Sequence, residues 1–341
     1  MSERIFTPVS IGSLTLPTRL VRSATELFGS LPDGHVPPEE IAIYERLSRE
    51  PLGLILTAHT CVSPEGRANR YQNAFWDDSY LPDGRAIAEA CGSVPCVMQL
   101  GHGGMKAKGN NGGLPVCTPD TMTTGEIREL VRAFGEAALR AKTAGFDGVM
   151  LHVAHLYLFS QFFYPEFNHR TDRYGGSAEN RIRIAAECAE QVHAVCGDDY
   201  PVLMKLNGTD RNLTPAYEQD VADALRIAEK CGIAACEISG WDSAPCVITD
   251  RPYFLDVVRR LKEQVDLPLI EVGGIRSAAD VEAVLDAGAV AASVSRPLLC
   301  DPSFPTRLRD EEGHRSPCRS CGFCFRPYPE RGRRICALHR E

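Results

Sequence analysis

The chain has 341 residues, and its content of 44% hydrophobic and 24% charged residues is typical of a soluble globular protein. Its formal net charge of −8 argues against nucleic acid as a partner. No apolar run approaches the roughly 18–20 residues that cross a membrane, and the N-terminus lacks the pattern of a signal peptide. We therefore expect a cytoplasmic protein with no membrane contact.

Eight short segments along the chain are apolar and rich in β-branched residues, as in strands that are buried on both faces. In chain order they are residues 20–25, 52–58, 94–100, 147–152, 201–206, 234–239, 268–273 and 290–295. Amphipathic segments that predict helices lie between them, and the clearest are residues 123–145, 177–197, 214–232, 253–265 and 277–288. Several of these begin with Ser or Thr and end with Gly, the residues preferred at helix caps.

Eight strands that alternate with helices predict an α/β protein with the (β/α)8 TIM barrel fold. A doubly wound sheet is the competing fold, but no G-x-G-x-x-G turn follows any strand, which removes its usual dinucleotide argument. The alternation stops near Asp310. We expect a barrel domain over residues 1–310 and a short cysteine-rich tail over residues 311–341.

Barrel enzymes carry their chemistry at the carboxyl ends of the strands, so the polar and glycine residues there are candidates for a site. The predicted strands end in or near Ser23, Ala24, Thr25, Gln99, His152, Lys205, Glu237, Ser239, Gly273, Gly274, Ser295 and Arg296.

The ends of the last two strands indicate a phosphate site. Gly273 and Gly274 allow close approach of the backbone, and Ser277 is placed to start a helix whose N-terminus favours an anion. Arg296 adds a charged fork, and barrels often bind phosphate in the loops after strands seven and eight. The alternative is a tight turn beside a surface arginine.

A histidine pair followed by a tyrosine forms a second constellation: His152, His155 and Tyr157. Two imidazoles at a strand end can point at one ligand oxygen, and such donors stabilise developing negative charge by roughly 3 kcal/mol each. Tyr157 is placed to supply a proton. Two alternatives stay open: metal binding, for which no third ligand stands at a suitable spacing, and histidines of the core or surface.

Together these residues resemble the old yellow enzyme family of FMN-dependent ene reductases, over roughly residues 5–310. In the most specific part, residues 145–181, the histidine pair precedes the segment N-x-R-x-D-x-Y-G-G-S-x-x-N-R. The stretches IGSLTLPTRLVRSAT, VSPEGR, MQLGHGG, VLMKLNG, EVGGIRS and SVSRPL follow the family order. Two positions depart from the pattern: Leu156 stands where glycine is usual, and Glu26 stands near where many relatives have a small or sulfur-bearing residue.

The resemblance implies an FMN across the barrel mouth and a role for each candidate residue. Ser23, Ala24 and Thr25 would border the flavin, Gln99 and Lys205 would contact the polar edge of its ring, and Gly273, Gly274, Ser295 and Arg296 would hold or border its phosphate. His152 and His155 would bind the carbonyl oxygen of an α,β-unsaturated substrate. Hydride would come from flavin N5, and Tyr157 would protonate the α-carbon.

The expected activity is reduction of the activated C=C bond of an enone, enal or enoyl thioester. NAD(P)H or an electron-donor protein is the expected electron source. Two other functions stay open: another FMN and iron–sulfur oxidoreductase, such as an N-demethylase, and a non-catalytic flavin electron-transfer module. The sequence leaves the oligomeric state open, a homo-oligomer included.

The tail carries four of the 14 cysteines in one dense group: Cys318, Cys321, Cys324 and Cys336. This spacing indicates a ligand set, and a reducing compartment argues against disulfides. C-x2-C-x2-C is a usual start of an iron–sulfur site, so we expect a [4Fe–4S] cluster, with structural zinc or no metal as the alternatives. The tail is similar to that of iron–sulfur flavoenzymes related to 2,4-dienoyl-CoA reductase, although three residues rather than two would be expected between the second and third cysteines.

Overall fold

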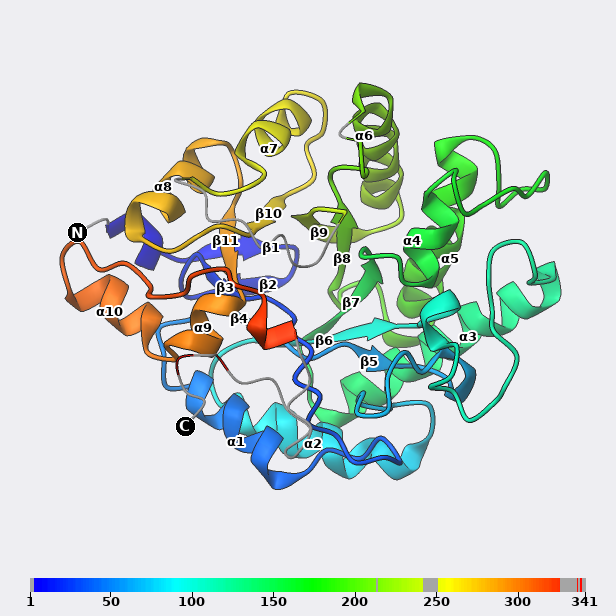
Figure 1. Ribbon diagram of the computed structural model, residues 1–341, viewed down its shortest axis with the longest axis horizontal. Coiled ribbons are helices and arrows are strands. Elements are labelled where there is room, and N and C mark those ends of the chain that lie inside the picture. Colours follow the sequence, from blue (N-terminus) through cyan, green and yellow to red (C-terminus); the bar gives the residue numbers. More distant parts are fainter. Residues whose placement is uncertain (1–2, 213, 242–250, 326–335, 337, 339–341) are drawn as a thin grey trace.

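The computed structural model describes residues 3–212, 214–241, 251–325, 336 and 338. Within them, eight parallel strands form a closed barrel (Figure 1): β3 (Leu20–Arg22), β4 (Leu54–Leu56), β6 (Cys96–Gly101), β7 (Gly148–Val153), β8 (Val202–Asn207), β9 (Ile233–Ser239), β10 (Leu269–Val272) and β11 (Ala291–Val294). The pairs β3–β11 and β4–β6 close the ring, and β5 (Thr60–Cys61) pairs with the end of β6. All eight predicted strands and the predicted barrel are confirmed.

A small antiparallel hairpin, β1 (Val9–Ile11) with β2 (Leu14–Leu16), closes one end of the barrel. Its apolar side chains share a buried cluster with the inward-facing residues of the strands: Ile11, Leu14, Leu16, Val21, Leu54, Leu56, Val97, Met150, Leu203, Ala235, Ile270 and Ala291. Most of these strand residues lie toward the amino ends. Because apolar packing fills the lumen there, the carboxyl ends are the side on which a site can form.

Helices surround the barrel on the outside (Figure 1). They are α1 (Pro38–Leu47), α2 (Leu81–Ala90), α3 (Thr124–Ala144), α4 (Leu158–Phe163), α5 (Ala178–Cys196), α6 (Pro215–Lys230), α7 (Leu255–Lys262), α8 (Ala278–Asp286), α9 (Arg296–Cys300) and α10 (Phe304–Asp310). Short 3-10 turns cover Glu3–Phe6, Pro64–Gly66, Asp78–Tyr80, Gly104–Ala107 and Phe323–Phe325. The five helices predicted from the sequence are confirmed as α3, α5, α6, α7 and α8.

Helix caps explain why the predicted boundaries agree with the structure. Thr123 and Glu126 form a capping box at the start of α3, and Gly145 ends this helix in the left-handed region at φ 102°. The Ser177 and Ser277 hydroxyls accept backbone N–H groups at the starts of α5 and α8.

The last described segment returns from the outside of the barrel to its mouth. After α10 ends at Asp310, the Ser316 backbone N–H donates to the Arg276 carbonyl at 2.8 Å. The chain then passes in front of the strands beside α9, where the Phe323–Phe325 turn lies (Figure 1). No helix within the described residues has the length and apolar character needed to cross a membrane.

Candidate active site

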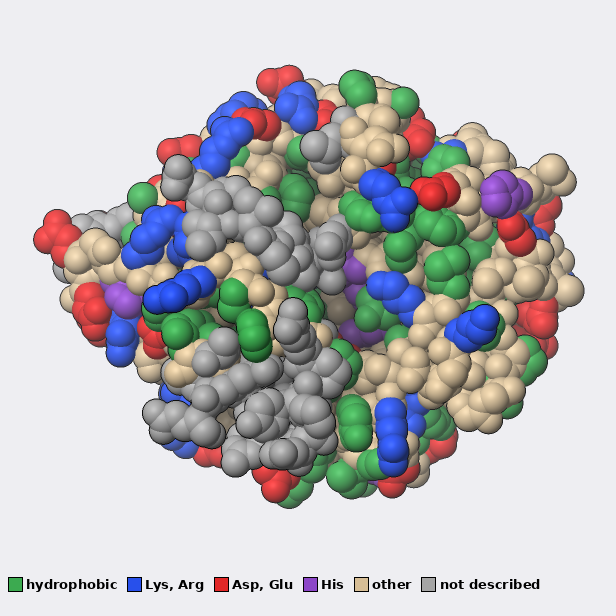
Figure 2. All heavy atoms as spheres, viewed as in Figure 1, with side chains coloured by type: hydrophobic (Ala, Val, Ile, Leu, Met, Phe, Trp, Pro, Cys, Tyr) green, Lys and Arg blue, Asp and Glu red, His purple; other side chains and the backbone are tan. Residues whose placement is uncertain are grey.

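A broad cavity at the carboxyl ends of the strands encloses about 1130 Å³ out to its mouth. The nine predicted cofactor residues and the three predicted catalytic residues all line it: Ser23, Ala24, Thr25, Gln99, Lys205, Gly273, Gly274, Ser295, Arg296, His152, His155 and Tyr157. Figure 2 shows the hollow in this face of the molecule, with histidine side chains inside it.

A buried ion pair forms part of the cavity floor. The register of β8 and β9 sets Lys205 beside Glu237, and the Lys205 Nζ lies 2.9 Å from Glu237 Oε2. Lys205 also donates to Ser23 Oγ at 3.1 Å. The contact with Glu237 is an ion pair by distance, and neither Glu237 oxygen has a hydrogen-bond partner among the described residues. Gln99, on β6, directs its amide nitrogen at the weak acceptor Met150 Sδ, at 3.2 Å, and has no other acceptor in the described part of the chain. Both side chains therefore keep donor capacity for a polar ring edge.

The histidine end of the cavity, which we define as His59, His152, His155 and Tyr157, is a cluster of rings. His152 lies on β7 opposite Lys205, and its ring centroid is 5.3 Å from that of His155 and 4.8 Å from that of Tyr157. His155 Nε2 lies 2.8 Å from Ser239 Oγ at the end of β9. Ser239 thus holds the orientation of the second imidazole.

Both imidazoles of the predicted pair are neutral near pH 7. Burial lowers the pKa of His152 well below its usual value, and His59, His155 and Lys205 lower it further. Burial, Lys205, Lys106 and His59 lower the pKa of His155 in the same way. The Nδ1 atom of His152 is buried without a hydrogen-bond partner in the part of the chain that the structure describes. A buried polar atom of this kind is suited to receive a ligand atom.

The turn after β7 keeps a left-handed backbone without glycine. His155 has φ 60° and Leu156, where the family resemblance leads one to expect glycine, has φ 58°. A residue with a Cβ pays roughly 1–2 kcal/mol for this conformation. Hydrogen bonds hold it: Lys106 Nζ donates to the His155 carbonyl at 2.6 Å, and Gln161 Nε2 donates to the Leu156 carbonyl at 2.7 Å.

At the other side of the cavity, two glycines provide a close-approach surface. Gly273 and Gly274 have φ 127° and 76°, and an added Cβ would come within 2.7 Å of the Tyr253 ring or 3.0 Å of the Pro252 Cα. Only glycine fits both positions without rearrangement. Their exposed backbone therefore faces the cavity at the place where the sequence predicts a phosphate.

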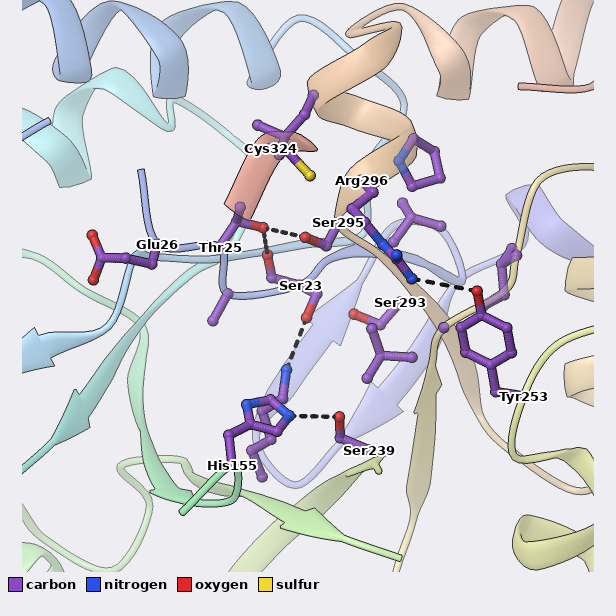
Figure 3. Close-up of a pocket in the computed structure, with 18 of the residues that line it drawn as sticks. Ser23, Thr25, Glu26, His155, Ser239, Tyr253, Ser293, Ser295, Arg296 and Cys324 are labelled. Atoms are coloured by element: carbon purple, nitrogen blue, oxygen red, sulfur yellow. Dashed lines mark hydrogen bonds between the residues drawn. The ribbon is translucent and has the colours of Figure 1, made fainter. Parts of the chain in front are cut away.

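Polar side chains complete this surface (Figure 3). Ser295 Oγ lies 2.7 Å from Thr25 Oγ1, and Arg296 Nη2 donates to the Tyr253 hydroxyl at the long distance of 3.4 Å. Ser293 Oγ is buried without a hydrogen-bond partner among the described residues. The donor set of amides, hydroxyls and a guanidinium fits a phosphate. At the start of α8, the Asp280 carboxylate accepts the Arg276 backbone N–H at 2.8 Å, just before the N-cap Ser277. An anion at this helix start stays a prediction.

Comparison with known proteins gives the family. The model of the NADH:flavin oxidoreductase / NADH oxidase family matches residues 4–314. The chain belongs to this family. FMN is the family's cofactor, and the donors described above fit it. The protein is therefore a flavin-dependent oxidoreductase, and its resemblance to old yellow enzymes is confirmed.

Individual family members cover the chain almost completely. The NADPH dehydrogenase of Bacillus subtilis (strain 168) is 31% identical over 326 residues, which are 89% of this chain and 94% of that protein. The NADH oxidase of Thermoanaerobacter brockii is 30% identical over 345 residues, which are 94% of this chain but 52% of that protein. The chain thus spans about half the length of this second relative.

Solved structures of the family have the same fold. The old yellow enzyme homologue from Zymomonas mobilis matches with a TM-score of 0.80 and 25% identity over 91% of this chain and 93% of that chain. Morphinone reductase matches with a TM-score of 0.79 and 27% identity over 93% and 92% of the two chains.

The cysteine end of the cavity, which we define as Cys318, Cys321, Cys324 and Cys336 with Arg296, lies beyond the phosphate surface. Cys318 and Cys324 line the main cavity, and all four cysteines line a second hollow that shares Arg296 and Leu299 with it. No three His, Cys, Asp or Glu side chains within the described ranges come together in a metal-binding group. The predicted cluster therefore stays a prediction.

Three residues of this family member lie in the cavity but were not assigned a role from the sequence. Ser239 stands at a predicted strand end, Lys106 places its Nζ 4.7 Å from the centre of the Tyr157 ring, and His59 packs against His152 and Tyr157. His59 directly follows the predicted strand 52–58. Reading the end of every predicted strand, the second included, would have identified it.

Glu26, the other departure from the family pattern, turns its carboxylate away from Ser23 and Thr25 (Figure 3). Its Oε1 accepts the Phe28 backbone N–H at 3.0 Å, in the loop that follows β3. Glu26 still lines the cavity, but its charge is directed at its own loop and away from the serine and threonine hydroxyls.

Proposed function

We propose that this protein is an FMN-dependent ene reductase, which reduces the activated C=C bond of an α,β-unsaturated carbonyl compound. The observation that carries the proposal is the arrangement of two buried neutral imidazoles, His152 and His155, at one end of a cavity. Lys205 lines the same cavity. FMN, when bound, supplies the reducing equivalents for this chemistry. The chain's own residues supply binding, orientation and a proton.

The flavin-binding surface has two parts in this proposal. Ser23, Ala24, Thr25, Gln99 and Lys205 border and hydrogen-bond the ring, because Gln99 and Lys205 have donor capacity that their protein contacts do not use. The phosphate is held by groups around the glycine pair: Gly273, Gly274, Ser295 and Arg296. A positive charge at Lys205 favours the electron-rich state of a bound ring.

The histidine end then binds the substrate carbonyl. His152 and His155 donate hydrogen bonds to its oxygen, which withdraws electron density and makes the β-carbon electrophilic. Tyr157 gives its hydroxyl proton to the α-carbon. The Lys106 ammonium, 4.7 Å from the centre of the Tyr157 ring, stabilises the phenolate that remains. Ser239 holds His155 in place through its 2.8 Å contact.

NAD(P)H is the proposed electron source. Relatives that match nearly their full length are named NADPH dehydrogenases, and a further relative is named NADH oxidase.

The tail, residues 311–341, is proposed to bind a [4Fe–4S] cluster through Cys318, Cys321, Cys324 and Cys336. Two observations support it: all four cysteines line one hollow, and two of them also line the flavin cavity. A cluster there would be an entrance for single electrons from a donor protein. Structural zinc is the alternative, because four thiolates also suit a closed tetrahedral site.

One preparation tests these proposals together. Protein purified without oxygen is analysed for FMN, iron, zinc and sulfide, and is then assayed with 2-cyclohexen-1-one and NADPH or NADH. We expect bound FMN, about four irons per chain if the tail holds a cluster, and enone-dependent oxidation of NAD(P)H. Stoichiometric zinc without iron would overturn the cluster and leave the reductase proposal standing.

Variants at the histidine pair test the assigned roles. His152→Ala and His155→Ala each remove one donor to the carbonyl oxygen, so we expect enone turnover to fall about 10²–10³-fold. FMN content should stay at the level of the unmodified protein. Full turnover in both variants would contradict the ene reductase mechanism. Loss of enone reduction with retained N-demethylation, or flavin binding without any turnover, would favour one of the two other functions.

A further inference from the structure

His59 is a buried imidazole that the mechanism above does not use. Its side chain is 3% exposed, and its ring stands edge-on to His152 at 4.9 Å and to Tyr157 at 4.3 Å between ring centroids. It lies in the loop after β4 and lines the cavity. A polar ring buried beside both proposed catalytic groups calls for a partner for each of its nitrogens.

Hydrogen bonds determine which nitrogen of His59 carries the proton. The Ala68 backbone N–H donates to Gln72 Oε1 at 2.7 Å, so the Gln72 Nε2 is the donor end of its amide. That Nε2 lies 3.0 Å from His59 Nδ1. The Gln72 amide therefore donates to Nδ1, and the His59 proton resides on Nε2.

The protonated Nε2 has no acceptor in the part of the chain that the structure describes. The tip of the ring occupies the space above Gly101, where any Cβ on residue 101 would collide with it. Gly101 is two residues beyond Gln99 on β6, so both face the same side of the strand, and Gln99 lines the cavity. The Nε2–H thus lies on the cavity side of the barrel wall.

His59 is also uncharged under working conditions. Burial lowers its pKa to about 3, with further contributions from Lys106 and His102. It is therefore a neutral single N–H donor, the same chemical state as the two histidines of the predicted pair.

We propose that His59 is a third hydrogen-bond donor for the carbonyl oxygen of the substrate, with its proton placed on Nε2 by Gln72. This inference rests on the proposed function, since it deepens the description of the same site. His59 contacts the ligand, whereas Gln72 is a positioning residue that acts through the tautomer of His59. The predicted pair thereby becomes a set of three imidazoles around one oxygen.

Binding of 4-hydroxybenzaldehyde tests the proposal independently of turnover, because the phenol presents a partly negative oxygen to the same donors. Its dissociation constant is measured from the change in flavin absorption on titration. His59→Phe keeps a ring of similar size without an N–H, so we expect binding to weaken about tenfold or more. His59→Gln keeps an N–H donor and should bind the phenol within about threefold of the unmodified protein.

Gln72→Glu is the matched variant for the tautomer. A carboxylate accepts a proton from Nδ1 where the amide donates to it, so Nε2 becomes an acceptor and the phenol should bind about tenfold more weakly. Gln72→Glu also provides an independent test of the role of His59 if the His59→Phe variant loses its flavin. Unchanged phenol binding in His59→Phe or in Gln72→Glu, with full FMN content, would overturn the role of His59.

The outcome is separable from that of the proposed function. If the unmodified protein binds FMN and the phenol but reduces no enone, the ene reductase proposal fails while the phenol series still decides the role of His59. If the unmodified protein with full FMN does not bind the phenol, the proposed donor set fails.

Discussion

The histidine end and the cysteine end of the cavity are held in place by different means. At the histidine end, strand register places the groups: His152, Lys205 and Glu237 are direct neighbours across β7, β8 and β9. At the cysteine end, the four cysteines lie on the tail after α10, where the described residues include a backbone bond to the barrel from Ser316 to Arg276. Strand register places His152 and side-chain contacts hold His155 at the first end, whereas the arrangement of the second end depends on what the cysteines bind.

Removing the charge of Lys205 should change the unfolding free energy more than any other substitution considered, and it distinguishes the histidine end from the cysteine end most clearly. Lys205→Met leaves Glu237 fully buried without its ion-pair partner, which typically costs about 3–5 kcal/mol of unfolding free energy. We also expect loss of bound FMN. Urea unfolding and the flavin content of the purified protein measure both effects.

The matched control lies at the cysteine end. Arg319 is an exposed residue of the same tail and is not one of the proposed ligands, so Arg319→Gln should change the unfolding free energy by less than about 0.5 kcal/mol and leave the flavin bound. Adding Glu237→Gln to Lys205→Met should recover part of the stability, because the unpaired charge is then removed. Equal stability of Lys205→Met and Arg319→Gln would show that strand register does not set the difference between the ends.

A second buried carboxyl group, that of Glu40 in α1, should make the stability of the folded protein depend on pH. Burial raises its pKa to about 7, although its Oε1 accepts a hydrogen bond from Asn73 at 2.9 Å. The folded state then holds the proton more tightly than the unfolded state, whose pKa is near the ordinary value. The stability contributed by this group is present below about pH 4.5 and is lost as the pH rises through 7.

Glu40→Gln should therefore match the unmodified protein near pH 4.5 and exceed it by roughly 3 kcal/mol above pH 7. The measurement is urea unfolding at several pH values between 4.5 and 8.5. A difference between the two proteins that does not change with pH would show that Glu40 ionises normally in the folded state.

Prediction from the sequence worked best where hydrophobic patterns and helix-cap residues define the elements and the barrel then aligns the ends of the strands. Apolar runs and helix caps gave the barrel, and the strand-end rule then gave the residues that line its mouth, because carboxyl ends of parallel strands meet at one rim. His59 was missed for a simple reason: its strand end was not read. Its tautomer lies beyond sequence reasoning, because it depends on the orientation of the Gln72 amide.

The predicted anion site at the start of α8 and the predicted metal site show a different limit of prediction from the sequence. Ser277 was rightly expected to begin α8, but the sequence does not reveal that Asp280 folds back onto the Arg276 backbone. For the tail, cysteine spacing indicates a ligand set but does not specify the metal, since both iron–sulfur clusters and zinc accept four thiolates.

The smallest expected effect concerns the backbone that presents His155. Leu156 has φ 58°, a conformation in which glycine avoids roughly 1–2 kcal/mol of strain. Leu156→Gly removes both the side chain, which packs against the core, and the strain. Leu156→Ala removes the packing but keeps most of the strain. We therefore expect Leu156→Gly to be more stable than Leu156→Ala by about 1 kcal/mol in urea unfolding.

This order is the reverse of the usual one, because glycine costs roughly 0.5–1 kcal/mol relative to alanine where the backbone is relaxed. If alanine is the more stable replacement, the turn has relaxed and the bonds from Lys106 and Gln161 do not hold it. If glycine is the more stable, the histidine end carries real backbone strain that those two side chains maintain. The strain would then be part of how His155 is kept within reach of both Ser239 and the substrate oxygen.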